Sequence, residues 1–197
     1  MEEKIFEIRW HGRGGQGAKT ASEMFAGILF KAGKYVQSFP EFGPERSGAP
    51  MTAFNRIADV KFRKNHNIYN PDLLVIVDKT LLKLDFVLKG IKDNGIILIN
   101  SSKESFEKLN IEEYFKDINV QIYIIDADKI SKEELGRVFP NIPLMSALSK
   151  ILEIPEKEEF LKAAKQEIQE KFNQKKSVIP GNIKALERAY DEVIKIK

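Results

Sequence analysis

Hydrophobic positions recur along the chain in the two periods that distinguish strands from helices. Residues 5–10 alternate between apolar and polar, as in a strand with one buried face. Residues 73–77 are continuously apolar, as expected of a strand that is covered on both faces. The pattern predicts strands at five places: residues 4–11, 35–39, 73–78, 96–100 and 120–126.

Apolar residues spaced three or four positions apart predict helices between and after these strands. The first stripe runs from Ala18 to Ala32, and Gly33 is suited to end that helix. Thr80 is the expected N-cap of a second helix. The remaining stripes predict helices over residues 81–91, 111–116, 141–152, 161–172 and 183–193, the last after a break at Pro180-Gly181.

Residues 51–57 and 60–63 predict a hairpin that closes on Ala58-Asp59. Strands that alternate with helical stripes predict the α/β class, and here a three-layer Rossmann-like domain with a mostly parallel sheet over residues 1–154. Residues 155–197 are rich in lysine and glutamate and predict a C-terminal helical extension. This extension either packs on the domain or reaches toward a partner, and packing is the commoner outcome for such stripes.

A glycine-rich turn follows the first strand and precedes the first helix. Gly12, Gly14 and Gly17 have the spacing of a phosphate-binding turn, in which the N–H groups at the start of the helix attract an anion. The spacing alone is weak evidence, because glycines between a strand and a helix can be purely steric. Both interpretations stay open from the sequence.

This chain lacks the additional residues that two classes of nucleotide-binding turn require. The second strand ends in Gln37-Ser38-Phe39, without the acidic residue that holds the ribose of NAD. No Gly-Lys-Ser/Thr ends the turn, so it is not a P-loop. Asp78, Asn100 and Asp126 follow later strands and either line a ligand crevice or cap the next turn, and capping is the favoured interpretation.

Composition narrows the possible chemistry. The 197 residues include no cysteine, which excludes disulfides and thiolate ligation of zinc or an iron–sulfur cluster by this chain. His11 and His66 are the only imidazoles. The net charge of +3, without a long basic run, does not indicate nucleic-acid binding. No stretch has the apolar length of a membrane span or a signal-peptide core, so we expect a cytoplasmic protein with no membrane partner.

A proline-rich loop, residues 40–50, interrupts the regular pattern. It contains three prolines, an aromatic residue and an arginine, Arg46. A stiff loop of this kind suits a protein interface, and the alternative is a lid that packs on the chain's own sheet.

Two long motifs carry a resemblance to a known family. Residues 6–20 (FEIRWHGRGGQGAKT) and 35–50 (YVQSFPEFGPERSGAP) resemble the gamma subunits of 2-oxoacid:ferredoxin oxidoreductases. Residues 69–72, Asp78 and residues 140–143 match as well. The similarity is greatest to the pyruvate type, pyruvate synthase, while the 2-oxoisovalerate and 2-oxoglutarate types remain open.

The resemblance implies a subunit rather than a whole enzyme. Members of the family oxidatively decarboxylate a 2-oxoacid, pass the acyl group to coenzyme A and reduce ferredoxin. Thiamine diphosphate with magnesium is expected between the alpha and beta subunits, and iron–sulfur clusters are expected in the beta and delta subunits. The sequence agrees, because this chain has neither cysteine nor a Gly-Asp-Gly motif for magnesium–thiamine diphosphate.

The expected role is to pack against the alpha, beta and delta subunits and to help enclose the approach of coenzyme A. No catalytic or metal-binding residue is expected here. The candidates for holding an anionic part of coenzyme A are Gly12, Arg13, Gly14, Gly15, Gln16, Gly17, Lys19 and Arg46. The alternative function is a stand-alone Rossmann-type nucleotide-binding protein.

Overall fold

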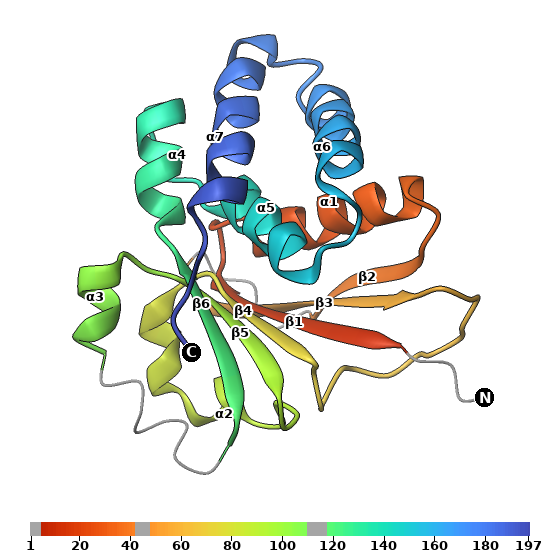
Figure 1. Cartoon of the computed structure of the whole chain (residues 1–197), viewed down its shortest axis with the longest axis vertical. Coiled ribbons are helices and arrows are strands. Elements are labelled where there is room, and N and C mark those ends of the chain that lie inside the picture. Colours follow the sequence, from red (N-terminus) through yellow and green to blue (C-terminus); the bar gives the residue numbers. More distant parts are fainter. Residues whose placement is uncertain (1–4, 42–47, 110–117) are drawn as a thin grey trace.

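A computed structural model describes residues 5–41, 48–109 and 118–197, and in this part of the chain seven strands form one sheet (Figure 1). The strand order is β2-β3-β1-β4-β5-β6-β7. The strands are β1 (Phe6–Arg13), β2 (Tyr35–Glu41), β3 (Pro50–Ala58), β4 (Leu73–Ile76), β5 (Gly95–Asn100), β6 (Val120–Ile125) and β7 (Ile194–Lys195).

The sheet is mixed, with parallel pairing at its centre. β1 pairs in parallel with β4, β4 with β5, and β5 with β6. β3 lies antiparallel between β1 and β2, and β7 is antiparallel to β6. β2 therefore points the same way as β1, and only β3 and β7 among the described strands run against the others. The prediction of a mostly parallel sheet is confirmed.

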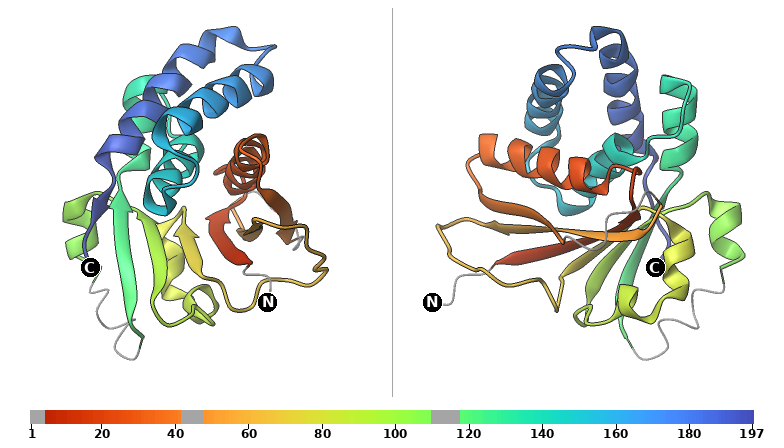
Figure 2. Two further views of the ribbon diagram at one scale, coloured as in Figure 1. Left: turned by 45° about the vertical axis from the view of Figure 1, so that its right-hand side comes forward. Right: turned by 180° about the vertical axis from the view of Figure 1, so that it is seen from behind.

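Helices cover the two faces of the sheet in different ways (Figures 1 and 2). Longer helices lie on one face, and short helical segments lie on the other face, beside β4 to β6. The first layer holds α1 (Ala18–Lys31), α4 (Ala127–Leu135), α5 (Asn141–Leu152), α6 (Lys157–Lys171), η3 (Lys176–Val178) and α7 (Ile179–Glu192). The second holds η1 (Lys79–Lys83), α2 (Asp85–Leu88) and α3 (Lys103–Glu107).

Alternation along β4 explains the three layers. Leu73 and Val75 belong to the apolar cluster under the longer helices, whereas Leu74 and Ile76 belong to the cluster under the short ones. All four side chains are fully buried, as the continuous apolar run requires. The three-layer prediction is confirmed.

The C-terminal helices share the first of these clusters. Phe160 and Ile168 of α6 and Leu186 and Tyr190 of α7 are buried in it together with residues of α1 and β1. Pro180 lies in the first turn of α7 instead of breaking the chain before it, a position where its missing N–H costs nothing. The division of the chain at residue 154 stays a prediction.

The predicted hairpin between residues 51–57 and 60–63 is wrong. β3 covers the first segment, but it pairs with β1 on one edge and β2 on the other. Because both edges of β3 are occupied, residues 60–63 cannot pair with it, and they contain no regular structure. The alternating pattern identified the strand but not its neighbours.

The single helix predicted over residues 81–91 is also wrong. Leu84 adopts an extended conformation, and it separates the 3-10 turn η1 from the short helix α2. The cap of η1 is Asp78, whose carboxylate accepts a hydrogen bond from the backbone N–H of Thr80. Four elements, α3, α4, η3 and β7, were not predicted, and the helix predicted at residues 111–116 lies outside the described residues.

Candidate functional site

The glycine-rich turn joins β1 to α1 at the C-terminal edge of the parallel strands. Gly17 is the N-cap of α1 and has a left-handed backbone conformation, with φ at 81°. A Cβ atom added there would lie 3.1 Å from the Cβ of Asn141, and one added at Gly12 would lie 3.2 Å from the Cβ of Ala18. Two of the three motif glycines therefore have steric reasons for being glycine.

The backbone donors of the turn are only partly available to a ligand. The N–H of Gly14 donates to the carbonyl of Ala49 at 2.9 Å, and the N–H of Gln16 donates to the carbonyl of Arg13 at 3.0 Å. Gly15 has φ at 95°, and beyond the two adjacent residues of the chain no heavy atom lies within 4 Å of a Cβ built on it. The open side of the turn is therefore at Gly15.

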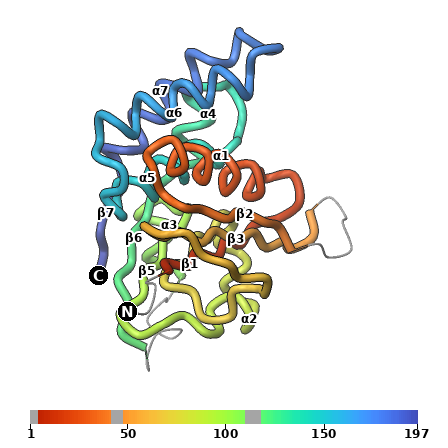
Figure 3. Tube along the Cα trace, turned by 90° about the vertical axis from the view of Figure 1, so that its right-hand side faces the viewer, coloured from red at the N-terminus to blue at the C-terminus, as the bar shows by residue number. Residues whose placement is uncertain are grey.

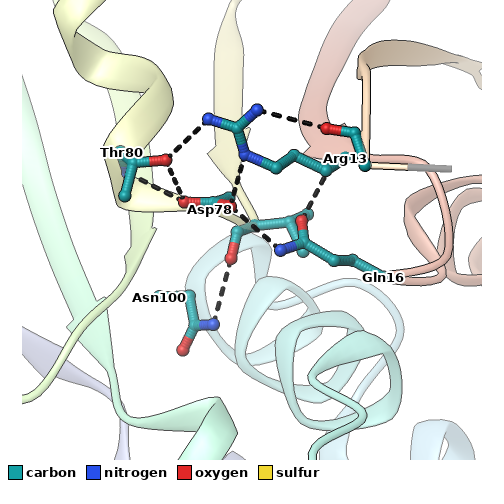
Figure 4. A network of polar contacts seen from close by, with 7 residues as sticks. Arg13, Gln16, Asp78, Thr80 and Asn100 are labelled. Atoms are coloured by element: carbon teal, nitrogen blue, oxygen red, sulfur yellow. Dashed lines mark hydrogen bonds and ion pairs between the residues drawn. The ribbon is translucent and has the colours of Figure 1, made fainter. Parts of the chain in front are cut away.

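Asp78 organises the side chains around the turn (Figure 4). One of its carboxylate oxygens, Oδ2, accepts hydrogen bonds from Arg13 Nε at 2.9 Å and from Gln16 Nε2 at 3.0 Å. The other, Oδ1, accepts from the N–H and the hydroxyl of Thr80. Gln16 in turn accepts from the backbone N–H of Arg13 at 2.7 Å. The carboxylate thus ties the end of β1 to the segment after β4.

Hydrogen bonding sets the ionisation of Asp78. Burial acts to raise the pKa of this carboxyl, but hydrogen bonds from Thr80, Gln16 and Arg13 outweigh burial and lower the pKa below its ordinary value. The Arg13 guanidinium is ion-paired with Asp78 and also donates to the carbonyl of Gly48. Arg13 therefore acts here as a structural link, with much of its charge balanced inside the protein.

The other predicted site residues are distributed differently. Lys19 lies on the first turn of α1, where its ammonium is 3.8 Å from Glu23 and its side chain is half exposed. Arg46 lies outside the described residues. Asp126 caps α4 by accepting from the N–H of Lys129, and Asn100 bonds the N–H of Ala127, so the capping interpretation of these strand ends is confirmed.

A cavity of about 410 Å³ adjoins the turn. Gly15 and Gly17 form part of its wall, and Asn141 of α5 and Gly181 of α7 form other parts. The N-termini of three helices of twelve or more residues, α1, α5 and α7, therefore border one cavity, together with the C-terminal ends of α4 and α6. Helix N-termini present N–H groups and a positive partial charge, which favours an anion.

Two basic side chains line the same cavity and were not among the predicted site residues. Arg137, whose guanidinium stacks 4.6 Å from the ring centroid of Phe139, comes from the loop between α4 and α5, and Lys171 comes from the end of α6. Glu134 is also in the wall, but it is ion-paired with Arg188. No sequence pattern marks Arg137 or Lys171, because tertiary packing alone brings them to the turn.

The comparison with known proteins shows the family of this chain. The family model described as pyruvate ferredoxin/flavodoxin oxidoreductase matches residues 7–192. The chain belongs to this family. It is 44% identical, over 98% of its length and 97% of the relative's, to the pyruvate synthase subunit PorC of Thermotoga maritima. It is 40% identical, over 96% and 98%, to the pyruvate/ketoisovalerate oxidoreductases common subunit gamma of Thermococcus kodakarensis.

Solved structures of this oxidoreductase family have the same fold. The crystal structure of pyruvate oxidoreductase subunit PORC from Thermotoga maritima superposes with a TM-score of 0.83 at 41% identity, covering 99% of this chain and all of that one. The 2-oxoglutarate:ferredoxin oxidoreductase from Magnetococcus marinus, solved with 2-oxoglutarate, coenzyme A and succinyl-CoA, gives a TM-score of 0.72 at 21% identity, over 96% of this chain and 31% of that chain. The latter likeness concerns the fold alone.

The described residues lack two features, a cluster of metal ligands and a membrane-spanning helix. In the ranges 5–41, 48–109 and 118–197, no three metal-ligating side chains from His, Cys, Asp or Glu gather into a potential ion site. No helix in those ranges has both the length and the apolar character needed to cross a membrane.

Proposed function

We propose that this chain is the gamma subunit of a pyruvate:ferredoxin oxidoreductase and that it holds the anionic part of coenzyme A beside its glycine-rich turn. The observation that carries the proposal is the full-length relationship to the pyruvate synthase subunit PorC, at 44% identity. The reaction of such a complex is the oxidative decarboxylation of pyruvate to acetyl-CoA with reduction of ferredoxin.

The cavity beside the turn is suited to the phosphates of coenzyme A. The open side of the turn, at Gly15, faces this cavity, and three helix N-termini border it. Arg137 and Lys171 add positive charge to its wall. The amide of Asn141 lines the cavity next to Gly17. The proposed site therefore keeps Gly12, Arg13, Gly14, Gly15, Gln16, Gly17, Lys19 and Arg46 as its predicted members and adds Arg137, Asn141 and Lys171.

Other subunits must carry the redox chemistry. Iron–sulfur clusters need thiolate ligands, and this chain has no cysteine, so alpha, beta and delta partners are proposed to hold the clusters and the magnesium–thiamine diphosphate. Ferredoxin then meets the complex rather than this chain. We propose the cytoplasm as the location of the complex.

A stand-alone nucleotide-binding role is not favoured. β2 ends without the acidic residue that holds a ribose, and β2 joins the sheet through the antiparallel strand β3 instead of a crossover to β1. The relatives that this chain matches over nearly their full length are named as subunits of oxidoreductases.

The test is a double substitution in the assembled enzyme. Arg137→Ala with Lys171→Ala removes two charges from the cavity wall and spares the backbone of the turn. We expect the KM for coenzyme A to rise about tenfold, which corresponds to roughly 1.4 kcal/mol, while the KM for pyruvate stays unchanged. Arg13 is a poorer target because its removal also takes away the ion-pair partner of Asp78.

Lys162→Ala with Lys184→Ala is the matched control, since these exposed lysines of α6 and α7 do not line the cavity. An unchanged KM for coenzyme A in the Arg137/Lys171 variant would show that the phosphates bind elsewhere and that the glycines of the turn are steric.

A further inference from the structure

The sheet face that lies opposite α1 changes in composition from strand to strand. On β1, β2 and β3 the side chains of this face are polar or aromatic, whereas on β4 to β6 they are aliphatic. The side chains that share it are those of Glu7, Arg9, His11, Gln37, Phe39, Phe54 and Arg56.

The charged groups on this face are satisfied by the chain itself. Arg56, whose side chain is fully buried, pairs with Glu7 at 2.8 Å. Arg9 donates to the carbonyls of Val87 and Lys89 at 3.0 and 2.7 Å. The buried charged side chains of this face are therefore held by partners within the chain and do not require a ligand.

Residues 59–72 cross this face without forming a helix or a strand (Figure 3). Arg56 donates to the carbonyl of His66 at 2.6 Å, and Ile68 is buried, so the segment is held at its middle. A groove of about 440 Å³ lies between this segment and β2, with Phe39 and Lys64 among its lining residues. Within the described ranges, no helix covers the groove.

Basic side chains outnumber acidic ones in this crossing segment. Residues 59–72 contain three basic residues, Lys61, Arg63 and Lys64. The two acidic residues of the segment, Asp59 and Asp72, are ion-paired with lysines outside it. None of the three forms an ion pair with another described residue.

Exposed aromatic side chains border the same face. Tyr69 is 70% exposed, Phe86 is 50% exposed and Tyr35 is 45% exposed. Tyr69 and Phe86 lie beside the buried pair Arg9 and His11, since Arg9 donates to the carbonyl of Tyr69 and the Phe86 ring lies 6.1 Å from that of His11. Exposed aromatic residues around a polar groove are typical of a protein interface.

We propose that this face, formed by β1 to β3 and residues 59–72, docks onto an acidic region of another subunit of the oxidoreductase. Charge complementarity selects the occupant, because three cations without internal partners are matched by carboxylates on the facing surface. The tyrosines and Phe86 contribute apolar contact around that charged centre. The inference rests on the proposed role as a subunit.

The experiment measures binding of this chain to the remaining subunits of the complex. The variant Lys61→Glu, Arg63→Glu, Lys64→Glu is expected to raise the Kd at least tenfold at low ionic strength. The difference from the unaltered chain should shrink as salt is added, since salt screens exposed charges. A second variant, Tyr69→Ser with Phe86→Ser, is expected to weaken binding at every salt concentration.

Lys129→Glu, Lys132→Glu, Lys162→Glu is the matched control, with the same change of charge on exposed residues of α4 and α6. Circular dichroism on each variant establishes that it is folded. Equal losses in the control and the test variant, or an unchanged Kd in both test variants, would overturn the docking surface. Failure of the unaltered chain to bind the other subunits would instead overturn the proposed function, and this inference with it.

Discussion

Arg9 and His11 illustrate how the fold accommodates ionisable side chains inside the sheet. Arg9 Nε donates to His11 Nε2 at 2.9 Å, so the neutral imidazole carries its proton on Nδ1. Burial, together with the neighbouring positive charge of Arg9, lowers the pKa of His11 to about 3. Burial also lowers the pKa of Arg9, to about 10. His11 is therefore a neutral structural acceptor rather than a catalytic base.

The ionisation of His11 predicts an acid-sensitive fold. An unfolded histidine gains a proton near pH 6.5, whereas the folded one does so only near pH 3, so stability is lost as the pH falls through this window. We expect His11 to reduce the free energy of unfolding by roughly 1.4 kcal/mol per pH unit below 6.5. His11→Gln retains an acceptor for Arg9 and should flatten this dependence in denaturant titrations at several pH values. His66→Gln, at an exposed position, is the control, and an equal slope in unaltered and His11→Gln protein would contradict the prediction.

At the scale of elements, Asp78 joins the end of β1 to η1. Asp78→Asn keeps the shape of the side chain but replaces one acceptor oxygen with an N–H donor, so the donors of Arg13 and Gln16 on one side and those of Thr80 on the other cannot all be satisfied. We expect a loss of about 1–3 kcal/mol in the free energy of unfolding at pH 7, measured by denaturant titration.

The pH dependence gives this prediction a second readout. Because the folded pKa of Asp78 is lowered, its contribution is present above pH 3.8 and is lost as the pH falls below that value. The Asn variant should lack this acid transition, whereas Asp93→Asn, at an exposed site, should behave like the unaltered protein. A variant as stable as the unaltered chain at pH 7 would refute the role of Asp78.

Some features of the fold were predictable from the local sequence pattern, whereas others depend on tertiary contacts. The strands other than β7 and the helix that starts at Asn141 were predictable, because burial on one or both faces leaves a periodic trace in the sequence. The pairing of β3 was not, since alternation shows which face is buried and not which strand lies alongside. At the site, the glycine turn was visible, but Arg137 and Lys171 reach it only through the packing of α4, α6 and α7.

The interface role expected of the loop at residues 40–50 remains a prediction. Its segment 42–47, which includes Arg46 and Phe42, lies outside the described residues. Its far end is tied to the turn, since the N–H of Gly14 donates to the carbonyl of Ala49 and the N–H of Gly48 donates to the carbonyl of Gly14. A contact between the loop and a thiamine-binding subunit would therefore be made close to the proposed coenzyme A site.

For the whole molecule, the lack of cysteine predicts an inactive isolated chain. The purified chain should show no visible absorbance from bound iron and no oxidation of pyruvate, because cluster ligation requires thiolates that it does not have. The measurement is ferredoxin reduction with pyruvate and coenzyme A, first with the chain alone and then with the other subunits added. Reduction by the single chain would contradict the assignment of the chemistry to its partners.

The central position of β1 has a consequence for how the chain folds. Trp10 lies opposite Ala53 on one side and opposite Val75 on the other, so each pairing closes a long loop, whereas β2 and β3 pair across a short connection. Closing a long loop costs more conformational entropy and slows folding. We expect the β2–β3 ribbon to form early and the docking of β1 to limit the refolding rate. The glycine turn, which continues β1, would then be among the last parts of the molecule to reach its final shape.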